Sequence, residues 1–132
     1  MHFFNNDELA NLKKYLYYSY IHDSKVQSVD YDAETRILKI SSFNPIYNVK
    51  IDFIFKDVKI NLLINCIGFG KRKTILSLTV EEDFSYLKEF TSICGDYLND
   101  SIYMVFQMFS GDEWHIVSKS VSIESEECIS LS

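Results

Sequence analysis

Apolar and polar residues near the start of this chain follow a helical spacing. Apolar residues recur there every three or four positions, as on one face of an α-helix: Leu9, Leu12, Leu16 and Tyr20. Asn5 or Asn6 is a candidate N-cap, and Glu8 stands three residues after Asn5 in a capping-box spacing. The spacing therefore predicts an N-terminal helix.

Beyond residue 22 the spacing changes to the alternation that half-buried strands show. Residues 25–32 and 36–43 are β-type runs separated by the polar turn DAET, which predicts a hairpin. Residues 47–65 also alternate, but their apolar positions move from odd to even numbers after Phe55. Because a slip of one residue reverses the faces of a strand, the sequence requires a bulge or bend near residue 57.

The rest of the chain predicts three more strands and a helix. Strands are expected at 74–82, at 101–109, whose apolar character on both faces indicates an interior strand, and at 113–124. A second helix is expected near 83–94, because Asp83 can cap it and Gly95 follows it.

These elements predict an α+β fold: a single antiparallel sheet of five to seven strands, bent near residue 57, with two helices packed on it. The length of 132 residues suits a single domain spanning 1–132. We expect the polar residues 125–132 to fray as a tail.

Composition changes this picture only through charge. Residues 1–80 carry 11 Lys and Arg against 8 Asp and Glu, whereas residues 81–132 carry 2 against 11. An acidic half disfavours nucleic acid as a partner, because binding to phosphates relies on Lys and Arg. It suits a basic protein partner, since complementary fields speed association. The alternative is that the excess carboxylates keep the protein soluble.

The sequence shows no recognisable targeting signal, and its cysteines are not spaced as a disulfide framework. Both observations predict a soluble, cytoplasmic protein. No apolar stretch approaches the roughly 20 residues that a membrane span needs. The first residues lack the basic and apolar regions of a secretory signal. The three cysteines, Cys66, Cys94 and Cys128, are odd in number and far apart, which argues against a disulfide framework.

His22, Asp23 and Ser24 stand side by side, and all three residue types serve acid–base and metal chemistry. A catalytic triad needs groups that converge from separated positions, whereas neighbours in an extended chain point to opposite faces. The structural alternative places His22 at the helix C-terminus, where its imidazole donates to free carbonyls. Asp23 and Ser24 would then bond to backbone N–H groups in a turn. The sequence favours this corner, and a ligand or catalytic role for His22 and Asp23 is the alternative.

Metal and cofactor motifs are not found in the sequence, so we expect neither group. The cysteines are separated by 28 and 34 residues, and no CxxC pair or suitably spaced His accompanies them. The run GFGKRKT at 68–74 lacks the spacing GxxxxGK[ST] of a phosphate loop, and it is better explained as a hairpin tip.

Trp114 follows the acidic turn SGDE and is the large apolar residue that we expect to be partly exposed. Exposed aromatic residues often anchor protein interfaces, although a position at the edge of the core is the alternative. With neighbouring carboxylates of the acidic half it gives a predicted partner-binding set: Trp114, Asp112, Glu113, Asp96 and Asp100.

Three runs carry a resemblance to a known group of proteins: YIHDSKVQSVDYDAETRILKI, VKIDFIFKDVKINLL and SIYMVFQMFSGDEWHIVSKSVSIE. The chain resembles a loose group of small bacterial α+β proteins that open with a helix, an HDS or HDA corner and a hairpin. Some members of that group resemble immunity proteins of polymorphic toxin systems.

Together with the uneven charge of the two halves and the lack of a credible active site, the resemblance favours a non-enzymatic protein-binding domain, and it suggests the immunity type, which neutralises a basic toxin through an acidic C-terminal half. It supplies no catalytic residue. Two alternatives stay open: a small ligand-binding or enzymatic domain using His22 and Asp23, and a structural or self-associating module. The sequence does not distinguish a monomer from a homodimer.

Overall fold

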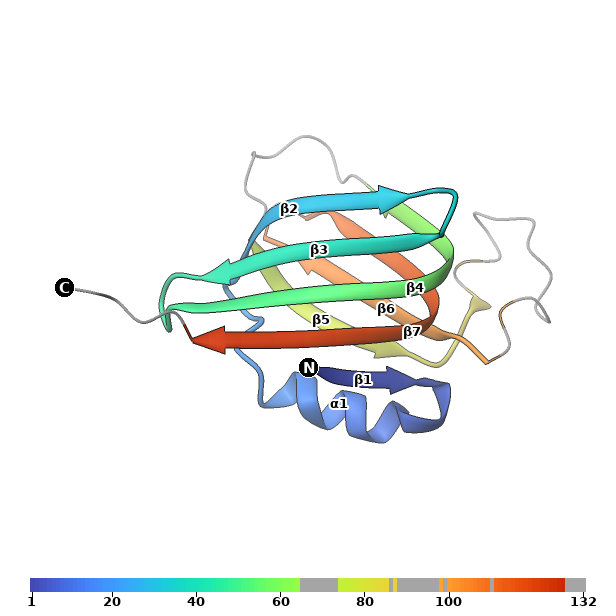
Figure 1. Cartoon of the computed structure of the whole chain (residues 1–132), viewed down its shortest axis with the longest axis horizontal. Helices are drawn as coiled ribbons and strands as arrows, with labels where there is room; N and C mark the ends of the chain where they lie inside the picture. The colour runs from blue at the N-terminus through green and yellow to red at the C-terminus, as the bar shows by residue number, and fades with distance from the viewer. Residues whose placement is uncertain (65–73, 86, 88–97, 99, 110, 128–132) are drawn as a thin grey trace.

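A curved antiparallel sheet forms most of the protein, and one helix packs against it (Figure 1). The computed structural model describes residues 1–64, 74–85, 87, 98, 100–109 and 111–127. Its seven described strands are β1 (His2–Asn5), β2 (Lys25–Asp32), β3 (Ile37–Asn44), β4 (Val49–Ile64), β5 (Ile75–Glu81), β6 (Ile102–Met108) and β7 (Glu113–Glu127). A 3-10 turn, η1 (Asn6–Glu8), leads into the helix α1 (Leu9–Tyr17).

The predicted antiparallel sheet with an N-terminal helix is therefore confirmed. The second helix, predicted near 83–94, lies largely outside the described residues. So do the run at 68–73 and the three cysteines. Strand β1 was not predicted, because four residues are too few to show an alternation.

Strand β7 is the centre of the sheet. The strand order is β2-β3-β4-β7-β6-β5, and β4 follows one edge of β7 for almost its whole length. Along the other edge β6 pairs with the first half of β7, and β1 pairs with the second half. Strand β6 lies between β7 and β5, which confirms the interior position predicted for 101–109.

The bend predicted near residue 57 is present in β4. The pairing of β4 with β7 shifts by one residue between Val58 and Ile60, and Asp57 has a φ of 52°. Before the shift Phe53 and Phe55 point into the main core, whereas Ile60 belongs to a second apolar cluster beyond it. Figure 1 shows β4 and β7 curving together from the layer that holds β2 and β3 into the layer of β5 and β6.

The two ends of the curled sheet meet at one place. Lys25 at the start of β2 forms a bridge with Thr74, just before β5. The Asp23 N–H donates to the Ile75 carbonyl at 2.9 Å, and the Ile75 N–H donates to the Ser24 carbonyl at 2.8 Å. The sheet thereby encloses the main core, in which the Phe53 and Phe106 rings meet edge to face at 5.4 Å.

Helix α1 covers the open side of the core beside β1 and β5. Leu12 is fully buried, and Leu9 and Leu16 pack against the same core, as the helical spacing predicted. The helix ends at Tyr17, so Tyr20 lies beyond it and does not continue its apolar face. Within the described residues, no helix is both long and apolar enough to cross a membrane.

The last strand, β7, extends further toward the C-terminus than the sequence predicted. Residues 125–127, which we expected to belong to a frayed tail, pair with Val49, Lys50 and Ile51 as the end of β7. Residues 128–132 lie outside the described part of the chain.

Candidate functional site

The corner formed by His22, Asp23 and Ser24 is tied into the fold by hydrogen bonds. Asp23 has a φ of 70°, a left-handed conformation that Asp tolerates better than most residues. His22 Nδ1 donates to the Leu76 carbonyl of β5 at 2.5 Å, and the buried Ser24 Oγ donates to the Tyr20 carbonyl at 2.7 Å. These contacts hold the loop after α1 against the start of β5.

Two details of the predicted corner are wrong. Helix α1 ends five residues before His22, so the imidazole bonds to β5 instead of to free helix carbonyls. The Asp23 carboxylate lies 3.5 Å from His22 Nε2, and the Ser24 hydroxyl is a donor to a carbonyl. The corner is nevertheless a structural junction, since all three residues join separate segments.

The expected exposure of Trp114 is wrong. Its side chain is only 8% exposed, and its ring lies 5.8 Å from the Phe106 ring in the main core. The indole Nε1 donates to Asn61 Oδ1 at 2.6 Å, which satisfies its N–H inside the protein. Burial removes the reason for treating Trp114 as an interface anchor.

The other predicted contact residues do not gather on one surface. Asp100 precedes β6 and Asp112 follows it, so the length of a strand separates them. The carboxylate of Glu113 accepts a hydrogen bond from Nε2 of the buried His115 at 3.2 Å. Asp96 lies outside the described residues.

A buried polar trio links β6 and β7 at this end of the molecule. Because the Glu113 carboxylate only accepts, His115 Nε2 carries a proton, and in the neutral ring Nδ1 accepts from the Tyr103 hydroxyl at 2.5 Å. Tyr103 and His115 are only 2% and 3% exposed. The trio satisfies a buried histidine, and neither of the grooves described below reaches it.

A cluster of exposed tyrosines is the most distinctive feature of the described surface. The rings of Tyr17 and Tyr18 meet edge to face at 5.0 Å at the end of α1, and those of Tyr20 and Tyr47 contact each other at 4.6 Å. Their exposed fractions are 82%, 72%, 44% and 59%. We call these four residues the tyrosine surface. Large apolar side chains rarely gather on a surface without a partner that covers them.

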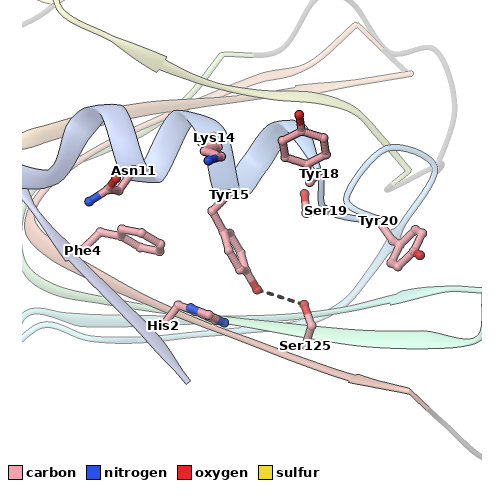
Figure 2. A pocket seen from close by; sticks show the side chains of 9 residues that line it. All are labelled: His2, Phe4, Asn11, Lys14, Tyr15, Tyr18, Ser19, Tyr20 and Ser125. Carbon is pink, nitrogen blue, oxygen red and sulfur yellow. Dashed lines mark hydrogen bonds between the residues drawn. The ribbon is translucent and has the colours of Figure 1, made fainter.

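An open groove of about 510 Å³ runs beside α1 (Figure 2). Tyr18 and Tyr20 line one end of it, and Tyr15 extends across it from the helix to share a hydrogen bond of 3.2 Å with Ser125 of β7. The remaining lining residues are His2, Phe4, Asn11, Lys14 and Ser19. A second groove of about 300 Å³ lies on the other side of α1 and includes Tyr17. The tyrosine surface therefore joins two hollows that flank the helix.

Asn44 fixes one half of the tyrosine surface from inside the protein. Its buried amide donates to the Tyr20 carbonyl at 2.8 Å and to the His22 carbonyl at 3.1 Å. Its Oδ1 accepts from the Ile46 N–H at 2.9 Å and the Tyr47 N–H at 3.3 Å. One buried side chain thus joins the two loops that carry Tyr20 and Tyr47, and the HDS corner holds the same loop through Ser24.

Charges surround the groove unevenly. Lys14 lines it on the helix side, whereas Glu127 extends β7 beyond Ser125 on the same face of the strand. Glu127 is exposed and lies opposite Val49, two residues along the chain from Tyr47. Glu124 and Glu126 project from the other face of β7 at the same end. The Tyr20–Tyr47 end of the surface is therefore the acidic end.

The tyrosine surface was missed at the level of the sequence, although one signal pointed to it. In the run YLYYSY at 15–20, Tyr17 and Tyr18 fall outside the apolar face marked by Leu9, Leu12 and Leu16. Aromatic residues on the polar face of a helix are a sign of a surface with a function. The contact of Tyr20 with Tyr47 is not visible in the local pattern.

The fold and the surface together define an antiparallel-sheet domain with an N-terminal helix and a set of exposed aromatic side chains. Comparisons with protein-family models, with curated proteins and with solved structures found no match to this chain. Among the described residues, no three His, Cys, Asp or Glu side chains are grouped so that they could hold a metal ion. A function must therefore be argued from the tyrosine surface itself.

Proposed function

We propose that this chain is a non-enzymatic protein-binding domain and that the tyrosine surface is its contact with the partner. One observation carries the proposal: the buried amide of Asn44 holds the backbone of the two loops that carry the exposed residues Tyr20 and Tyr47. Tyrosine supplies a large amphipathic contact area at a low cost in conformational entropy, and it is enriched in protein interfaces. Fixing the loop backbone before binding lowers that entropy cost further.

The partner that suits this surface is a basic protein. Glu127 lies opposite Val49, two residues after Tyr47, and Glu124 and Glu126 add negative charge at the same end of β7. In the particular role that the resemblance suggests, the domain is an immunity-type protein that covers a basic toxin. The carboxylates at the end of β7, and not the predicted set around Trp114, are then the charged groups that face the partner.

Site-specific photo-crosslinking in the native host tests the proposal. A benzophenone side chain is introduced at position 18 or 47, and in a matched control at position 31, where Tyr31 is also exposed but lies on β2. We expect one protein to cross-link from positions 18 and 47 and not from position 31. Mass spectrometry identifies it.

The purified partner then allows the charge to be tested. Its affinity is expected to fall as salt rises, because salt screens exposed charges. Equal cross-linking from all three positions, or a partner that binds independently of salt, would contradict the proposal.

A further inference from the structure

If the proposed function holds, the chemistry of the tyrosine surface indicates which chemical group of the partner binds there. The Tyr20 and Tyr47 rings contact each other at an angle of 33°, so an incoming group must stack on an outer ring face. Both rings are partly exposed, and a ring face is electron-rich and attracts cations.

The charges around this ring pair indicate which group stacks there. Glu127 is exposed, lies on the same face of β7 as Ser125, which lines the groove, and pairs across the sheet with Val49, two residues after Tyr47. Lys14 lies on α1, on the helix side of the groove. Lys50, opposite Glu126 on the other face, is paired with Asp52 at 3.5 Å. A cation is therefore favoured beside Glu127, at the end of β7, and opposed beside Lys14, on the helix side of the groove.

We propose that the Tyr20–Tyr47 pair binds an arginine side chain of the partner, with Glu127 as its carboxylate. A guanidinium is planar and weakly hydrated, so it can stack on a ring and donate to a carboxylate at the same time. A lysine ammonium is compact and strongly hydrated, and it makes the charge contact without the planar stack. The geometry thus selects arginine over lysine.

A labelled peptide of alternating arginine and serine residues is the probe, and fluorescence anisotropy measures its affinity. A peptide with lysine in place of arginine has the same charge and serves as the matched probe. We expect the arginine peptide to bind more tightly than the lysine peptide. Tyr47→Leu is expected to lower the affinity for the arginine peptide about 2- to 30-fold, which is the range for the loss of one cation–π contact.

Two variants separate the ring contact from a change of fold. Tyr47→Phe keeps the ring face and is expected to retain most of the affinity. Tyr31→Leu removes an exposed tyrosine on β2 and is expected to leave the affinity unchanged. Far-ultraviolet circular dichroism and the unfolding midpoint show whether each variant is folded. Glu127→Gln is expected to weaken binding and to reduce its dependence on salt.

The failure of this inference differs from the failure of the proposed function. Equal affinities for the arginine and lysine peptides would overturn the arginine site. So would an affinity for the arginine peptide that does not change in Tyr47→Leu. Binding of a proline-rich peptide without arginine at the same rings would overturn it as well. A partner that cross-links from positions 18 and 47 but is not displaced by the arginine peptide would leave the proposed function standing and reject arginine recognition.

Discussion

At the scale of single residues, side chains with reactive chemistry serve mainly to position backbone. Ser24 and Asn44 are buried, and both donate to the Tyr20 carbonyl. Asn44 satisfies both its donors and its acceptor through two loops. Because an unsatisfied buried polar group is costly, such a side chain determines a local structure more sharply than its neighbours do.

Replacing Asn44 by alanine tests this positioning. Asn44→Ala is expected to lower the free energy of unfolding by about 2–4 kcal/mol, because it removes four part-buried hydrogen bonds between this side chain and the backbone of two loops. Urea denaturation measures the loss. Asn11→Ala is the control, since Asn11 is an exposed amide on α1. A loss below about 1 kcal/mol for Asn44→Ala would show that the two loops do not depend on this amide.

At the scale of elements, the bend in β4 shapes the whole sheet. Asp57 adopts a left-handed conformation beside the register shift, and its carboxylate accepts from Arg36 at 3.1 Å. The pair is about half exposed on both sides, so its charge interaction contributes little to stability. The backbone conformation is the more demanding feature, since β-branched residues disfavour it strongly.

Substitutions at position 57 separate conformation from charge. Asp57→Val is expected to lower the free energy of unfolding by about 1–2 kcal/mol, because valine resists a positive φ. Asp57→Asn loses the charge but tolerates the conformation, so its effect should stay within about 0.5 kcal/mol. Guanidinium denaturation distinguishes them. Equal effects of Val and Asn would mean that the ion pair, and not the conformation, is what matters at the bend.

Elements with a long regular pattern could be predicted from the sequence, and contacts between distant segments could not. The alternation and slip of residues 47–65 gave β4 with its bend, because the spacing itself records the faces. The burial of Trp114 could not be predicted, since it depends on Phe106 and Asn61 from other strands. The Tyr20–Tyr47 contact likewise depends on Asn44, which lies 24 residues from Tyr20.

At the scale of the whole molecule, the curled sheet decides where charge and aromatic residues meet. The described carboxylates of the acidic half do not form one face, because β7 carries them at both of its ends, from Glu113 to Glu127 across the protein. One end of β7 carries the buried His115 contact, and the other end, at Ser125, lines the same groove as Tyr18 and Tyr20. The overall charge of −6 therefore acts on a partner through its local distribution.

Calorimetric titration of the purified partner against three forms of the protein tests whether the tyrosine surface is the binding site. The forms are the wild type, the double variant Tyr18→Ala/Tyr47→Ala, and the double variant Asp100→Asn/Asp112→Asn from the set predicted by sequence. We predict that the tyrosine variant binds at least about tenfold more weakly, as for residues central to an interface, and that the aspartate variant binds like the wild type. Unchanged affinity of the tyrosine variant, with a loss in the aspartate variant, would contradict the account.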